Sequence, residues 1–123
     1  MAKVTGLGGL FYKVADPDRT KKWYRETLGV GSEWGAMFAF KDDSPDGFSL
    51  LTPFTADSDK FAPSALPFMI NLRVDNIDAF VAELEGKGVA ILDRQADDYG
   101  KFAWIMDPDG VKLELYQQAG DQA

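Results

Sequence analysis

Histidine and cysteine are both absent from this chain of 123 residues. Imidazole and thiolate are the usual protein ligands of catalytic zinc, nickel and iron, so their absence excludes the common sites for these metals. The lack of cysteine also excludes a disulfide framework and is compatible with a reducing compartment. No apolar run approaches the roughly 20 residues that span a bilayer, and Met1 to Gly9 do not resemble a signal peptide. We therefore expect a cytoplasmic protein.

Basic residues are outnumbered by acidic ones, 13 Lys and Arg against 20 Asp and Glu, which gives a net charge of −7. Proteins that bind nucleic acid or anionic membranes need a basic surface, so we expect neither partner. The acidic balance leaves a cationic ligand open, although an acidic surface that only keeps the protein soluble is the simpler explanation. The apolar fraction of 46% is typical of a folded chain, and the length fits one domain over residues 1–123.

A weak internal repeat appears when the chain is compared with itself at an offset of 60 residues. The segment 10–16 then lies opposite 70–76, and each reads as an alternating strand that ends in Lys-Val or Arg-Val before a helix cap. In the first half Asp16 can cap a helix that starts at Pro17 and stops at Gly29. In the second half an apolar stripe with helical spacing predicts the next helix, through Ile77, Phe80, Val81 and Leu84, which ends at Gly86 and Gly88.

Short strand candidates follow each predicted helix. They cover residues 36–40 and 48–54 in the first half, and 89–93, 102–106 and 111–116 in the second. Each half therefore reads as a βαβββ module, over about 6–54 and 67–117, with a polar linker at 55–66. The modules are too short to fold alone, so we predict an α+β fold in which both share one core.

The two-residue period of a strand divides the side chains between two faces. The aliphatic sets, such as Ile70 with Leu72 or Leu113 with Leu115, are the ones that a covering helix would bury. The opposite sets are mixed and face either water or a cavity. They are Gly9, Phe11 and Lys13 in the first strand, Met69, Asn71 and Arg73 in the middle strand, and Lys112, Glu114 and Tyr116 in the last strand.

Three segments resemble the vicinal oxygen chelate superfamily of glyoxalase I, extradiol dioxygenases, fosfomycin-resistance proteins and bleomycin-binding proteins. They are residues 14–30, residues 74–78, and the turn Asp107-Pro108-Asp109-Gly110 with the strand that follows it to Leu115. The resemblance covers nearly the whole chain. It implies two βαβββ modules whose sheets form a glyoxalase/bleomycin-resistance-like cup, with a ligand held by the open faces. It also implies a homodimer.

The metal ligands of these enzymes can be placed on this sequence by the same resemblance. The two positions usually held by histidine correspond to Gly9 and Met69, the third lies near Leu50, and the fourth is Glu114. A thioether is a soft, weak donor, and one carboxylate holds a divalent ion only loosely. We therefore expect no metal and no other cofactor.

Glu114 has two interpretations. A single carboxylate on a strand is more often solvated or paired than catalytic, but inside a cup it needs a partner, for which the candidates are Asn71, Arg73, Lys13 and Lys112. Alone in a dry cup, Glu114 could serve as a general base with a raised pKa. The sequence shows no second acid, base or nucleophile beside it.

Aromatic side chains are more often core or rim than ligand platform, which applies to Trp34, Tyr99, Phe102 and Trp104. Phe11 shares a face with Gly9, and Trp104 lies on the strand expected beside Glu114, so these two are the better cavity candidates. The predicted ligand-binding set is Phe11, Leu50, Met69, Asn71, Arg73, Trp104 and Glu114.

Three functions remain open at this point. The first is a metal-free small-molecule binding protein of the glyoxalase/bleomycin-resistance type, which holds an aromatic or cationic ligand by stacking and charge. The second is a metal-independent lyase or isomerase that uses Glu114 as its general base. The third is a structural or regulatory module whose cup is filled by its own side chains.

Overall fold

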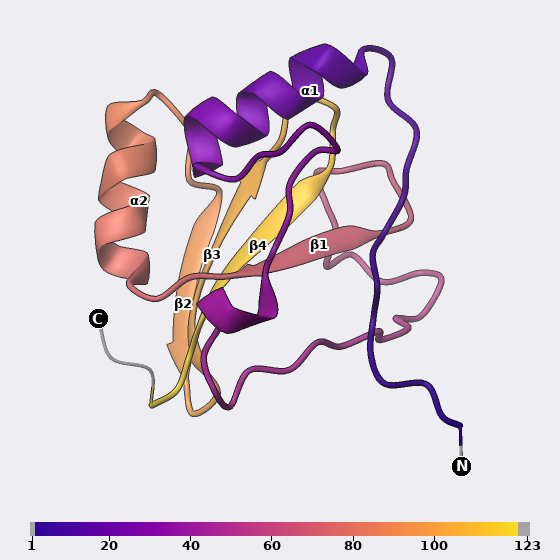
Figure 1. Cartoon of the computed structure of the whole chain (residues 1–123). Coiled ribbons are helices and arrows are strands. Elements are labelled where there is room, and N and C mark those ends of the chain that lie inside the picture. Colours follow the sequence, from indigo (N-terminus) through magenta and orange to yellow (C-terminus); the bar gives the residue numbers. More distant parts are fainter. Residues whose placement is uncertain (1, 121–123) are drawn as a thin grey trace.

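The second half of the chain forms a four-stranded sheet, covered by helices on one face. The computed structural model describes residues 2–120. The strands lie in the order β1-β4-β3-β2 and are β1 (Met69–Arg73), β2 (Asp93–Asp97), β3 (Gly100–Met106) and β4 (Lys112–Gln118). β1 is parallel to β4, and the other neighbours are antiparallel. Helix α2 (Ile77–Gly86) joins β1 to β2, so the second half has the βαβββ order of elements that the sequence predicts (Figure 1).

The core lies between this sheet and the helices. Ala103 and Ile105 of β3 and Leu113 and Leu115 of β4 are fully buried, and they alternate with half-buried residues along each strand. The stripe of α2 packs on the same cluster, with Ile77, Val81 and Leu84 buried. Tyr24 and Leu28 from the first half complete the cluster, so both halves share one core, as predicted.

The first helix begins as predicted and ends in a wider turn. Asp16 caps helix α1 (Pro17–Trp23) by accepting a hydrogen bond from the Arg19 N–H at 3.2 Å. A π-helical segment, η1 (Tyr24–Leu28), continues it and stops at Gly29, whose φ of 75° is left-handed and suits glycine. No helix among residues 2–120 is long and apolar enough to cross a membrane.

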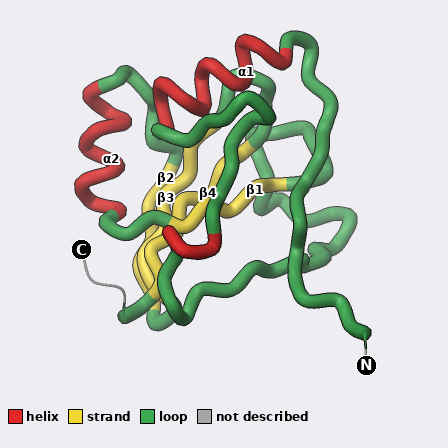
Figure 2. The backbone as a smooth tube through the Cα atoms, in the orientation of Figure 1, coloured by secondary structure: helices red, strands yellow, loops and turns green. Residues whose placement is uncertain are grey.

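The strand predictions for the first half are wrong. Residues 2–68 contain no strand, and the 3-10 helix η2 (Phe40–Asp42) occupies the end of one predicted strand (Figure 2). The side chains of Phe11, Phe40 and Leu51 are 95%, 92% and 89% exposed. A strand is stable only when its backbone pairs with a neighbour and one face is covered, and these segments have neither in the single chain.

One boundary in the second half is also wrong. The strand predicted at residues 89–93 begins only at Asp93, where β2 pairs with β3 through a register that sets Asp93 opposite Trp104. Val89 and Ile91 instead pack against the core beside α2. Every residue of β2 is exposed, because β2 is an edge strand that depends on backbone pairing. Its sequence Asp-Arg-Gln-Ala-Asp therefore lacks both the apolar run that marks β3 and the apolar alternation that marks β4.

Candidate ligand-binding surface on the open face of the sheet

The sheet face opposite the core carries the mixed side chains. Because the aliphatic residues of β3 and β4 are buried, their neighbours along each strand point to the other face. These open-face residues are Met69, Asn71 and Arg73 of β1, Phe102, Trp104 and Met106 of β3, and Lys112, Glu114 and Tyr116 of β4. Five members of the predicted set, all except Phe11 and Leu50, lie on this face.

Glu114 is held at the centre of this face by two neighbouring strands. The sheet register sets Asn71 of β1 and Trp104 of β3 directly opposite it, one on each side. Glu114 Oε1 accepts a hydrogen bond from Asn71 Nδ2 at 2.7 Å, and Oε2 accepts one from Trp104 Nε1 at 2.9 Å. The carboxylate therefore has the partners that a half-buried position demands, and it fixes the orientation of the indole.

Three aromatic rings form a row beside this carboxylate. The rings of Trp104 and Phe102 are nearly parallel, 10° apart with centroids 6.0 Å apart, and Phe102 stacks on Tyr116 at 5.0 Å and 18°. All three are half-buried, and the Tyr116 hydroxyl donates to the Tyr99 carbonyl at 3.0 Å. Offset stacking of this kind suits a planar aromatic ligand, which can extend the row. The sequence favours core or rim for Phe102, and the structure places it in the row.

The cationic groups of this face are already engaged within the chain. Lys112 Nζ lies 5.8 Å from the centroid of the Trp104 ring and donates to the carbonyls of Lys60 and Ala62 at 2.9 and 2.8 Å. Arg73 is a predicted partner of Glu114, but its guanidinium pairs with Asp43 instead, through Nε at 2.9 Å and through Nη2. These hydrogen bonds hold the pKa of Asp43 below its usual value.

Phe11 and Leu50 lie outside this cluster. Both sit on segments without secondary structure, with their side chains 95% and 72% exposed. A Cβ added at Gly9 would meet the Phe11 ring at 3.6 Å, so the two residues lie close together although no strand forms there. No described contact brings Phe11 or Leu50 to Glu114, because the strands that should have carried them to the sheet are not formed.

The residues present do not fit a divalent metal. Within residues 2–120, no group of three or more Asp or Glu side chains could together hold an ion. At the ligand positions that the resemblance implies, Gly9 offers no donor, Met69 only a thioether and the Leu50 region a hydrocarbon. Glu114 already accepts one hydrogen bond on each oxygen. A metal-assisted step would therefore lack the ligands it needs at these positions.

A second polar cluster, which the sequence does not predict, joins the final turn to α1. The buried Tyr24 hydroxyl donates to Asp107 Oδ2 at 2.7 Å, and Asp109 accepts from Thr20 Oγ1 at 2.5 Å and from Arg19 Nη2 at 2.9 Å. Burial and the Asp107 carboxylate raise the pKa of Tyr24 well above its ordinary value. The sequence indicates this cluster only through the polar side of α1. Both aspartates accept hydrogen bonds from first-half side chains, so they connect the two halves of the chain.

The family model of the Glyoxalase/Bleomycin resistance protein/Dioxygenase superfamily matches residues 6–115. This chain belongs to that superfamily. The match extends over both halves, including the first-half segments in which no strand forms.

Several solved structures have a similar fold. TnmS3, an antibiotic binding protein from Streptomyces sp. CB03234, is 25% identical with a TM-score of 0.51, over 86% of this chain and 89% of TnmS3. A glyoxalase/bleomycin resistance protein from the same organism is 26% identical with a TM-score of 0.52, over 85% and 93% of the two chains. A protein from the mobile metagenome of V. Pseudocholerae has a TM-score of 0.57 at 20% identity, over 95% and 97%.

Among curated proteins, the chain is similar to the uncharacterized protein YaeR of Escherichia coli (strain K12). The two are 47% identical over 47 residues, which are 37% of this chain and 36% of YaeR. The chain thus matches about a third of the length of that relative.

Proposed function

We propose that this superfamily member is a cytoplasmic small-molecule binding protein that holds a planar aromatic ligand on the open face of its sheet without a metal. The observation that carries the proposal is the row of Trp104, Phe102 and Tyr116 beside a carboxylate fixed by two hydrogen bonds. A flat molecule can stack on the row and present a donor to Glu114, whose oxygens each keep a free lone pair.

The sequence predicts either an aromatic or a cationic ligand, and the local charge favours the aromatic one. The Lys112 ammonium already lies close to the Trp104 ring, so a cation stacked there would meet a like charge. The net charge of −7 attracts cations to the protein as a whole, but at this ring the Lys112 ammonium offsets the Glu114 carboxylate that is bonded to the indole. An aromatic ligand with a hydrogen-bond donor fits these groups better.

The likeness to TnmS3 supports binding as the activity, since that protein is described as antibiotic binding. The catalytic alternative has less support. The two groups hydrogen-bonded to Glu114 are an amide and an indole, and neither exchanges a proton readily at neutral pH. A general base would have no proton relay here, so we favour binding over a lyase or isomerase.

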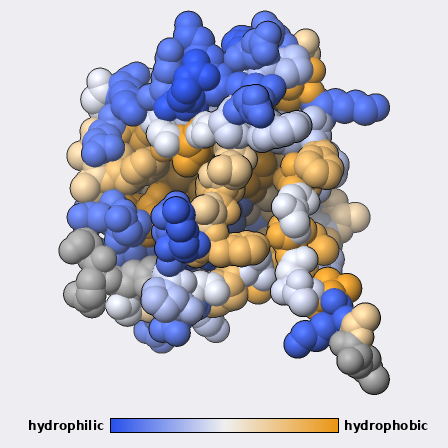
Figure 3. Space-filling view, viewed as in Figure 1, coloured by the Kyte–Doolittle hydropathy of each residue, from blue (hydrophilic) through white to orange (hydrophobic). Residues whose placement is uncertain are grey.

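A second copy of the chain is proposed as the partner. A monomer of this mass exposes about 6,500 Å², whereas this chain exposes 9074 Å². Apolar side chains gather in a band across one face of the molecule (Figure 3). The first-half segments that lack a strand partner carry many of the exposed apolar residues, including Phe11, Phe40, Phe48, Leu50 and Leu51. In a homodimer these segments would pair with the partner chain and close the cup.

Titration calorimetry with a panel of planar heteroaromatic compounds tests the proposed ligand class. We expect saturable binding, and we expect Trp104→Ala to weaken it about fivefold, because loss of one stacking ring in a half-buried site costs on the order of 1 kcal/mol. Trp34→Ala is the matched control, since Trp34 is 82% exposed and lies outside the cluster. Equal loss in both variants, or no binding by any compound, would contradict the proposal.

A further inference from the structure

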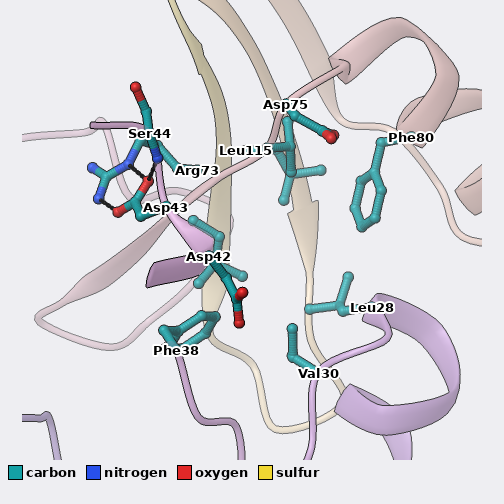
Figure 4. A pocket seen from close by; sticks show the side chains of 12 residues that line it. Leu28, Val30, Phe38, Asp42, Asp43, Ser44, Arg73, Asp75, Phe80 and Leu115 are labelled. Carbon is teal, nitrogen blue, oxygen red and sulfur yellow. Dashed lines mark hydrogen bonds and ion pairs between the residues drawn. The ribbon is translucent and has the colours of Figure 1, made fainter. Parts of the chain in front are cut away.

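A separate cavity lies at the carboxyl end of β1, away from the Glu114 cluster. Its volume is about 500 Å³, within the range of small-molecule sites. It is bounded by the end of η1, the residues that follow β1, the start of α2, and the segment 38–44 (Figure 4). Neither Glu114 nor any ring of the aromatic row lines it.

The floor of this cavity is apolar. Leu28, Val30, Leu72, Phe80 and Leu115 contribute hydrocarbon to it, and Phe38 forms one wall. Leu28 and Leu115 belong to the buried core, so the floor is rigid, whereas Phe38 is 60% exposed. Such a floor favours the hydrocarbon part of a ligand, because burial of apolar area stabilises the complex.

The rim of the cavity carries net negative charge. Arg73 and Asp43 are both on the rim, but they neutralise one another in a two-point ion pair, and Arg73 also donates to the Phe48 carbonyl. The side-chain carboxylates of Asp42 and Asp75 have no hydrogen-bond or ion-pair partner anywhere in residues 2–120. Figure 4 shows the Asp42 carboxylate beside Phe38 and the Asp75 carboxylate beside Phe80, so the two approach the apolar floor from different sides.

We propose that this cavity is a second binding site, for a small lipophilic cation whose ammonium lies between Asp42 and Asp75 and whose hydrocarbon tail covers the floor. A ligand with the same hydrocarbon tail and an anionic head group would be repelled by the two carboxylates. A ligand with a neutral head group would gain the apolar contact alone. The cation gains both, and the net charge of −7 raises its concentration near the surface.

The test uses the full chain labelled with ¹⁵N, titrated with hexylammonium and, separately, with 1-hexanol. Both probes have the same hydrocarbon tail, and only the first is charged at pH 7. We expect hexylammonium to bind about fivefold more tightly than 1-hexanol, because exposed carboxylates attract an ammonium modestly. The amide shifts should map to residues 28–30, 38–44 and 72–80. The preference should fall as salt is raised from roughly 0.02 to roughly 0.5 M, because screening becomes strong over that range.

The double variant Asp42→Asn/Asp75→Asn should bind both probes equally. The control Asp57→Asn/Asp59→Asn makes the same change of charge outside the lining and should keep the fivefold preference. Phe38→Ala should weaken both probes alike, since it removes part of the wall without touching the core. Equal binding of the two probes to the unaltered protein, or equal loss in the control, would overturn the proposal.

The Trp104 indole N–H resonance separates this proposal from the function proposed for the sheet. It should stay unchanged with hexylammonium and move with a planar aromatic ligand. If hexylammonium moves the Trp104 resonance and leaves residues 38–44 unchanged, the second site is wrong while the sheet site stands.

Discussion

Individual polar residues in this chain act mostly through partners far away in the sequence. The turn Asp107-Pro108-Asp109-Gly110 is recognisable from its residue types, and Asp107 Oδ1 does accept the turn N–H groups of Asp109 and Val111 at 2.8 and 2.9 Å. Its other oxygen binds the Tyr24 hydroxyl, 83 positions earlier in the chain. No local pattern predicts such a pairing. For the same reason the Asn71 and Trp104 contacts of Glu114 are only candidates until the strand register is known.

Tyr24→Phe removes only the hydroxyl and therefore tests its hydrogen bond to Asp107. We expect the free energy of unfolding at pH 7 to fall by about 1–3 kcal/mol, because a buried carboxylate oxygen of Asp107 loses its donor. The measurement is urea unfolding followed by circular dichroism, with Tyr99→Phe as control, since Tyr99 is 76% exposed. No difference between the two variants would show that the hydroxyl contributes nothing.

The raised pKa of Tyr24 adds a pH dependence to the same experiment. A folded-state pKa above the unfolded value of about 10 means that this stabilisation is complete below pH 10 and is lost as the pH rises further. As the pH rises from about 10 to 11, the free energy of unfolding of Tyr24→Phe should therefore fall less than that of the unaltered protein. Parallel losses in both proteins would contradict this assignment.

At the scale of elements, the sequence predicts those that bury a face of their own. The stripe of α2 and the strands β3 and β4 reflect packing on a core, and the cap at Asp16 fixes the start of α1. All of these predictions are confirmed. β2 escapes prediction because it is fully exposed. The first-half strand predictions fail for the opposite reason. The apolar residues of these segments are present, but the single chain offers no surface for them to cover.

Gly100→Ala tests the turn that joins β2 to β3. Gly100 has a φ of 145°, and an added Cβ would lie 2.1 Å from the Gln117 carbonyl oxygen of β4, a backbone atom that cannot rotate away. We expect a loss of about 2–4 kcal/mol in the free energy of unfolding, from backbone strain and overlap together. Thermal unfolding of Gly86→Ala is the control, because Gly86 lies in α2 with open space around its Cα. A loss of similar size in both would refute the steric argument.

At the scale of the whole molecule, the repeat predicts two equivalent halves, yet only one builds its sheet. The shared core is present, and the strand-forming part of the first half is exposed. Composition and periodicity indicate which segments need a neighbouring strand, but they do not indicate whether that strand belongs to the same chain.

Sedimentation equilibrium tests the proposed homodimer. We expect a dimer at micromolar concentration, because pairing of the exposed segments would bury at least the roughly 1,600 Å² of a standard interface. Phe40→Asp/Leu51→Asp should shift the protein to monomer, since both side chains lie in these segments and are about nine-tenths exposed in the single chain. Tyr99→Asp, on the β2–β3 turn, is the control and should remain dimeric. A monomer at 0.1 mM, about a hundredfold above that range, would exclude the proposal.

The alignment of Asn71, Glu114 and Trp104 across three strands has a consequence for evolution as well as for binding. A one-residue insertion or deletion within β4 would bring Leu113 or Leu115 to the centre of the open face and send Glu114 into the core. The site thus tolerates exchange of the residues around it far better than any change in strand length. Descendants of this chain can acquire new ligands by substitution, but the spacing from Trp104 to Glu114 is one they must inherit unchanged.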